Sequence, residues 1–115
     1  MAAGSYDFVV YQGDTLEKTF EWRDKNQTLV PLTGYTARMQ VRSSADSDDV
    51  VLEMTTEDNG ITLTNPGQIV VSASAEEMAE VAAGSYKYDL EMVTGDGFVR
   101  KLLVGKFKVL AEVTR

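Results

Sequence analysis

The sequence has no cysteine and no histidine among its 115 residues. The absence of cysteine excludes disulfide bonds, thiolate zinc sites, iron–sulfur clusters and cysteine nucleophiles. The absence of histidine excludes an imidazole base and imidazole metal ligands. Any catalysis would therefore rely on carboxylates, lysine, serine or a metal held by carboxylates.

Basic residues are also scarce, with 11 Lys and Arg against 18 Asp and Glu and a formal net charge of −7. Because nucleic acids and anionic membranes attract proteins of the opposite charge, this balance predicts that neither is a partner. No apolar run approaches the roughly 20 residues of a membrane-spanning helix. The opening residues 1–5 lack the basic and apolar regions of a secretory signal. We therefore expect a protein made in the cytoplasm and kept there, or built into a particle assembled there.

What the sequence does contain is a two-residue alternation of apolar and polar side chains, clearest over residues 35–42 and 86–92. This alternation predicts strands with one face in a core and the other in water. Residues 16–22 alternate in the same way, except that Lys18 falls on the apolar face, so we expect it near a sheet edge. Other candidate strands are residues 6–12, 50–54, 61–64, 68–73 and 98–110, the last with a bulge or bend predicted at Gly105.

Turn-forming residues separate these runs and predict hairpins, one through residues 94–97 and another around Asn65-Pro66-Gly67. Ser74 and Glu77 have the spacing of a capping box, which predicts a short helix. Met78 and Val81 or Ala82 should face the core, and Gly84 should end the helix as a left-handed cap. With no long crossover helix, the pattern indicates a single all-β antiparallel sandwich or barrel over residues 1–115, with residues 1–5 as a flexible arm.

The loop at residues 43–49 holds the only suggestion of a metal site. Asp46, Asp48 and Asp49 could supply oxygens to calcium, yet the run lacks the glycine turn and the bidentate glutamate of the helix-loop-helix calcium motif. A solvated loop is the favoured interpretation, and we expect no cofactor.

Two pairs of carboxylates could share one strand face, Glu17 with Glu21 and Asp89 with Glu91. Both strand faces are predicted to be exposed to solvent, and the sequence predicts no apolar pocket that would shift the pKa of a carboxyl group. We therefore do not expect an enzyme. Basic residues concentrate in the last strand, where they could meet an acidic partner or form a solvated outer face. They are Arg100, Lys101, Lys106 and Lys108.

Taken over the whole chain, the order of these segments resembles that of a known family. The most specific segment is Leu32-Thr33-Gly34-Tyr35-Thr36-Ala37-Arg38-Met39-Gln40, and the next is the strand entry Gly84-Ser85-Tyr86. With Gly60-Ile61-Thr62-Leu63 and Gly105-Lys106-Phe107-Lys108-Val109, they resemble the small immunoglobulin-like domain of tailed bacteriophages. Similar domains form the N-terminal part of the upper baseplate proteins of phage tails. The resemblance covers residues 8–115 and implies an immunoglobulin-like sandwich of seven or eight strands with one short helix.

The same resemblance implies a non-enzymatic virion protein of the tail, neck or baseplate, or a decoration of the head. Its partners would be other phage structural proteins, contacted by multiple copies in a symmetric assembly. Docking would use sheet edges and chain ends. The interface candidates are Tyr6, Phe8, Val10, Arg100, Lys106, Lys108, Val113 and Arg115. The alternatives are a virion-displayed carbohydrate- or receptor-binding module, which would expose aromatics on one face, and a carboxylate-based hydrolase.

Overall fold

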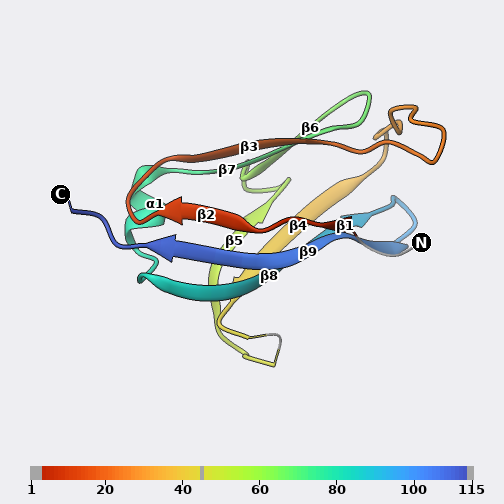
Figure 1. Cartoon of the computed structure of the whole chain (residues 1–115). Coiled ribbons are helices and arrows are strands. Elements are labelled where there is room, and N and C mark those ends of the chain that lie inside the picture. The colour runs from red at the N-terminus through yellow and green to blue at the C-terminus, as the bar shows by residue number, and fades with distance from the viewer. Residues whose placement is uncertain (1–3, 45, 114–115) are drawn as a thin grey trace.

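Two β-sheets pack face to face in the computed structural model, which describes residues 4–44 and 46–113 (Figure 1). Within these residues the secondary structure consists of nine strands and one short helix. The elements are β1 (Gly4–Ser5), β2 (Phe8–Tyr11), β3 (Leu16–Glu21), β4 (Thr36–Arg42), β5 (Val50–Thr55), β6 (Ile61–Thr64), β7 (Gln68–Ala73), α1 (Ala75–Ala79), β8 (Gly84–Val93) and β9 (Val99–Leu110).

The strand order is that of an immunoglobulin-like sandwich. Sheet A has the order β9–β8–β4–β5, with β1 and β2 both pairing parallel to the outer side of β9, and sheet B has the order β3–β7–β6. The chain crosses between the sheets after β2, β3, β5 and β7, which gives the Greek-key connections of this fold. At the last crossing the Tyr86 hydroxyl donates to the Ala82 carbonyl at 2.5 Å, a tyrosine corner. The predicted fold class is therefore confirmed.

The core forms from the inward side chains of both sheets, as the alternation predicted. In β4, Ala37, Met39 and Val41 are buried, and each points away from the polar side chains between them. Phe8 lies 5.0 Å from Tyr88 between ring centroids, and the Trp22 ring meets Tyr35 edge-on at 5.6 Å. The buried side chains of both sheets belong to one apolar cluster. Within the described residues, no helix is long and apolar enough to span a membrane.

The predicted helix is present and its capping box is complete. Glu77 N donates to Ser74 Oγ and Ser74 N donates to Glu77 Oε1, each at 3.1 Å. Met78 and Val81 are buried, whereas Ala82 is exposed. Gly84 does not cap the helix, because the amides of Glu80 and Val81 close the last turn on carbonyls three residues earlier. With its terminal carbonyls bonded in this way, α1 ends without a left-handed residue, and Gly84 instead begins β8.

Gly105 is neither a bulge nor a bend. It pairs in register with Tyr88. The register shift between β8 and β9 lies three residues earlier in β9, at Leu102, which has no partner in β8 because Leu103 pairs with Leu90 and Lys101 pairs with Glu91. A side chain at Gly105 would overlap the backbone oxygen of Tyr6. Glycine is therefore required here by the close approach of another backbone.

The opening segment is ordered earlier than predicted. Gly4 and Ser5 form β1 rather than part of a flexible arm, while residues 1–3 lie outside the described residues. The segment is held at Tyr6, whose amide donates to the Val104 carbonyl at 3.2 Å and whose carbonyl accepts from the Tyr88 hydroxyl at 2.6 Å. Because the chain breaks its strand at Tyr6 and Asp7, the described chain has nine strands instead of the predicted seven or eight.

Lys18 lies at a sheet edge, as its position on the apolar face of an alternating strand predicted. It is on β3, an edge strand of sheet B that pairs only with β7. Its Nζ atom lies 5.0 Å from the centroid of the Tyr6 ring and 5.8 Å from that of Phe20. The ammonium is thus stabilised by two aromatic rings at the open side of the sandwich.

Candidate docking surface on sheet A

The outer face of sheet A, which points away from sheet B, gathers most of the basic side chains. Six of the 11 Lys and Arg lie there among the described residues, with four carboxylates. Without the acidic loop that extends beside it, this face therefore carries a net positive charge, although the chain has a net charge of −7. Such an asymmetry favours association with an anionic surface. The cations are Arg38, Arg42, Lys87, Lys101, Lys106 and Lys108, and the carboxylates are Asp7, Glu53, Asp89 and Glu91.

One half of this face is internally neutralised. Arg38 Nε donates to Glu91 Oε1 at 2.9 Å, and Lys101 Nζ lies 3.0 Å from Asp89 Oδ2. The hydrogen bond and the charge of Asp89 raise the pKa of Lys101. Both carboxylates of the predicted pair are thus bound to cations on an exposed face, so the arrangement lacks the apolar surroundings of a catalytic acid.

The other half carries a cation row, formed by Arg42, Lys87 and Lys106. Arg42 on β4 is directly opposite Lys87 on β8, and Lys87 is directly opposite Lys106 on β9. None of the three forms an ion pair with another described residue. The Arg42 guanidinium donates to neutral acceptors only, the Ser47 carbonyl at 2.7 Å and Gln40 Oε1 at 2.8 Å. Like charges at directly opposite positions destabilise a sheet, so this row is receptive to an anion.

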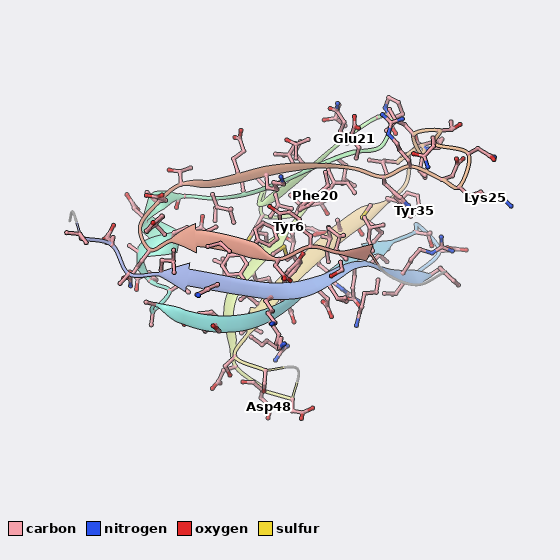
Figure 2. All side chains as sticks on the ribbon, viewed as in Figure 1. Tyr6, Phe20, Glu21, Lys25, Tyr35 and Asp48 are labelled. Carbon is pink, nitrogen blue, oxygen red and sulfur yellow. The ribbon has the colours of Figure 1, made fainter. Side chains whose placement is uncertain are left out.

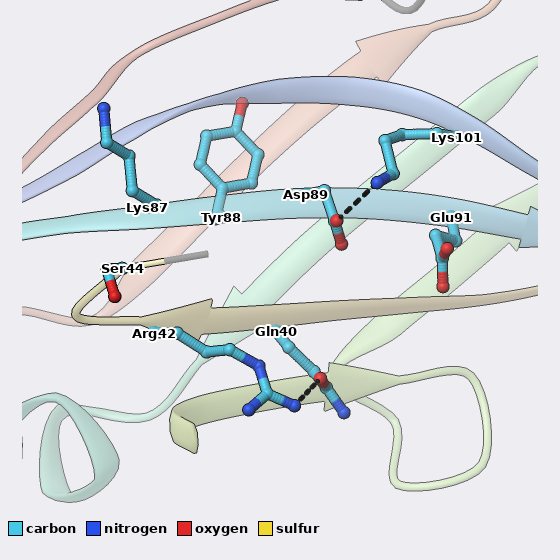
Figure 3. A pocket seen from close by; sticks show the side chains of 8 residues that line it. All are labelled: Gln40, Arg42, Ser44, Lys87, Tyr88, Asp89, Glu91 and Lys101. Atoms are coloured by element: carbon cyan, nitrogen blue, oxygen red, sulfur yellow. Dashed lines mark hydrogen bonds and ion pairs between the residues drawn. The ribbon is translucent and has the colours of Figure 1, made fainter. Parts of the chain in front are cut away.

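A shallow groove of about 290 Å³ runs along these strands (Figure 3). Arg42 and Lys87 line one end, and the paired Asp89 and Lys101 line the other. A neighbouring hollow continues from Lys87 across β9 to Lys106 and Asp7. The groove is open to solvent and mostly charged, which suits a contact with another macromolecule better than an enclosed small-molecule site.

The described part of the acidic loop, residues 43–44 and 46–49, extends away from both sheets on the side opposite sheet B (Figures 1 and 2). Asp46, Asp48 and Asp49 are exposed, and Asp48 is at the far end of the loop in Figure 2. No three acidic side chains of the described residues converge on a possible metal position. The calcium candidate is therefore not supported. The loop is held by Arg42 at the Ser47 carbonyl and by Asp49 N donating to Ser47 Oγ at 3.2 Å.

The structure points three of the interface candidates inward. Phe8 is only 2% exposed and sits opposite the buried Phe107, Val10 packs on the core, and Tyr6 is half-buried against Phe8. Phe8 is therefore unavailable to a partner, and Tyr6 and Val10 are only partly accessible. The exposed large apolar residues of the same segment are Val9 at 64% and Tyr11 at 52%. Sequence reasoning missed both because β2 is apolar at all four positions, so alternation cannot tell which two face outward.

The remaining candidates lie on different surfaces. Lys106 and Lys108 share the outer face of sheet A, but Arg100 is opposite the buried Met92 and lines a hollow near Trp22 between the sheets. The extra residue Leu102 reverses the alternation and separates Arg100 from the later lysines. Val113 is 94% exposed, and Arg115 lies outside the described residues.

No protein-family model matches the sequence, and no curated protein matches it. Solved structures that are similar to the chain include the following three. CopC from Methylosinus trichosporium OB3b has 17% identity and a TM-score of 0.41, over 69% of this chain and 66% of that chain. Mouse leukocyte-associated immunoglobulin-like receptor 1, a strand-swapped dimer, has 13% identity and a TM-score of 0.43, over 95% and 84%. Murine CRIg has 14% identity and a TM-score of 0.42, over 92% of each chain.

Proposed function

We propose that this protein is a non-enzymatic structural component of a tailed-bacteriophage particle, docking onto the tail, neck or baseplate or decorating the head. The phage assignment rests on the sequence resemblance carried by residues 32–40 and 84–86. The docking role is supported by an unprotected strand edge on β2. Multiple copies on a symmetric particle can hold firmly through contacts that are individually modest.

The free edge of β2 is the observation that carries the docking role. Among the described residues, no strand pairs with the side of β2 that faces away from β9. The amides of Tyr6 and Gln12 donate to carbonyls of β9, at 3.2 Å and 2.8 Å. Since amides alternate in direction along a strand, those of Val9 and Tyr11 point to the open side. A strand from a partner can pair there and extend sheet A.

The side chains around this edge favour burial. Val9, Tyr11 and Val113 are all largely exposed, and β2 and β9 end on the same side of the molecule (Figure 1). The nearby edge of sheet B differs, because β3 carries the inward-pointing Lys18. An inward charge on an edge strand discourages pairing with another chain. The contrast makes the β2 edge more open to a partner than the β3 edge.

The carbohydrate- or receptor-binding alternative has less support. A carbohydrate-binding module would carry a group of exposed aromatic side chains on one face. The strongly exposed aromatics of the described residues are Tyr11 at 52% and Phe98 at 60%. Tyr11 is opposite Leu110 at the end of β9, whereas Phe98 precedes the first residue of β9. They lie at opposite ends of the sheet and cannot form one stacking platform.

The test is co-sedimentation of the purified protein with phage particles that lack it. We expect the wild type and Val9→Thr to bind, and Val9→Pro to lose binding, because proline removes an amide of the open edge while the bonds to β9 remain. Val9→Glu is a second variant that leaves the backbone intact and should weaken binding by placing a charge against the buried side chain of a partner strand. Circular dichroism confirms that each variant is folded. Absence of wild-type binding, or equal binding by every variant, contradicts the proposal.

A further inference from the structure

We propose that the outer face of sheet A binds a second copy of this chain, with the acidic loop of each copy on the cation row of the other. This inference concerns a different surface from the β2 edge and does not depend on the phage assignment. It rests on two unpaired charge groups of opposite sign that the fold places on one face.

The first group is the cation row. Arg42, Lys87 and Lys106 occupy directly opposite positions on three adjacent strands, without an ion pair to any other described residue. The neighbouring cross-strand positions Arg38, Glu91 and Lys101 alternate in sign. Opposite charges therefore face each other across the strands at Arg38, Glu91 and Lys101, whereas only like charges face each other along the cation row. Such a local conflict is typical of a functional surface whose compensation comes from outside the chain.

The second group is the acidic loop. The side chains of Asp46, Asp48 and Asp49 are exposed and form no ion pair with the described residues. The loop stands out from the face that carries the cation row, and the hydrogen bond from Arg42 to the Ser47 carbonyl anchors its base. It is thus a projection of negative charge, with Asp48 at its far end in Figure 2, beside the groove that Arg42 and Lys87 line at one end (Figure 3).

Within one chain the two groups touch only at Arg42, which donates to the Ser47 carbonyl at the base of the loop. The loop follows Arg42 at one end of the row and extends away from the sheet, while the row continues across β8 to Lys106 on β9. A two-fold rotation lets the projection of each copy enter the groove of the other, so both groups are compensated twice in one closed interface. This self-complementarity favours a second copy over an unrelated acidic protein, and the net charge of −7 disfavours a nucleic acid.

Sedimentation equilibrium of the purified chain tests the proposal, over loading concentrations from about 1 μM to about 1 mM. At low salt we expect a monomer–dimer equilibrium that weakens as NaCl is added, because the contacts are screened. Lys87→Glu and Asp48→Lys should each weaken dimerisation by about tenfold or more. The matched controls Lys25→Glu and Glu17→Lys reverse one exposed charge away from this face and should leave it unchanged.

Mixing the two variants provides the decisive measurement. Lys87→Glu and Asp48→Lys each place like charges at their own interface, but a heterodimer of the two brings opposite charges together at both contacts. We expect the mixture to dimerise more tightly than either variant alone. A monomeric wild type at all concentrations, or a mixture no tighter than its components, overturns the proposal. Binding of poly-glutamate or duplex DNA to a wild type that stays monomeric would overturn it in favour of an acidic protein or nucleic acid.

Discussion

Substitution of Gly105 by alanine should destabilise the protein by about 2–4 kcal/mol, although it adds one methyl group. The new Cβ would overlap the Tyr6 carbonyl oxygen and lie 2.9 Å from its carbon and 3.0 Å from Asp7 Oδ1. The opening segment must therefore move away from β9.

The size of the effect follows from the hydrogen bonds that this movement breaks. Tyr6 N to the Val104 carbonyl, the Tyr88 hydroxyl to the Tyr6 carbonyl, and Lys106 N to Asp7 Oδ1 measure 3.2, 2.6 and 3.0 Å. Each intramolecular hydrogen bond contributes about 1 kcal/mol, and a buried hydroxyl left without an acceptor adds about 1–3 kcal/mol. Loss of all three bonds without replacement would therefore cost about 4–6 kcal/mol, and because part of the segment can bond to water instead, we expect about 2–4 kcal/mol.

Urea denaturation followed by the fluorescence of Trp22 measures this change in the free energy of unfolding. The matched control is Gly95→Ala, whose Cβ would meet the Gly34 carbonyl oxygen at 3.7 Å, an ordinary contact. We expect the control to stay within about 0.5 kcal/mol of the wild type. Equal stability of Gly105→Ala and Gly95→Ala would refute the steric role assigned to Gly105.

Two further predictions concern charge and ionisation. Lys87→Glu should raise the free energy of unfolding by about 1 kcal/mol, because it turns two like-charge cross-strand neighbours into opposite ones; thermal unfolding of the dilute monomer should show the gain, and about 1 M NaCl should remove most of it. A loss of stability, or a gain that salt does not change, would contradict this. Burial raises the pKa of Tyr88 above its ordinary value of 10.0. The unfolded chain therefore loses this proton first, so the contribution is complete below about pH 10 and is lost as the pH rises further. The difference in stability between the wild type and Tyr88→Phe should shrink from about pH 9 to about pH 11 in urea titrations, and a constant difference would refute the assignment.

Local patterns predicted much of the fold. The alternation in residues 35–42 and 86–92 identified β4 and β8 with their buried faces, because side-chain direction in a strand depends only on the backbone. Ser74 and Glu77 identified the helix for a similar reason, since both bonds of a capping box close within one turn. The misplaced Lys18 indicated an edge strand through the energetic penalty of burying an ammonium.

Only part of the docking surface could be predicted from the sequence. Lys87 and Arg42 were placed on wet strand faces, yet nothing local shows that they lie opposite each other, because that depends on the register of β4 against β8. The bulge at Leu102 likewise separates Arg100 from Lys106. In β2, four consecutive apolar residues left the inward pair undetermined until the pairing with β9 set it.

The sequence by itself determined most of the strand segments, where the helix begins and that the chain is acidic, because these follow from neighbours along the backbone and from composition. The tertiary structure alone decided which charges meet across strands, which edge stays open and why Gly105 must lack a side chain. Those features depend on contacts between residues far apart in the chain, and their energies exist only once the two sheets have formed.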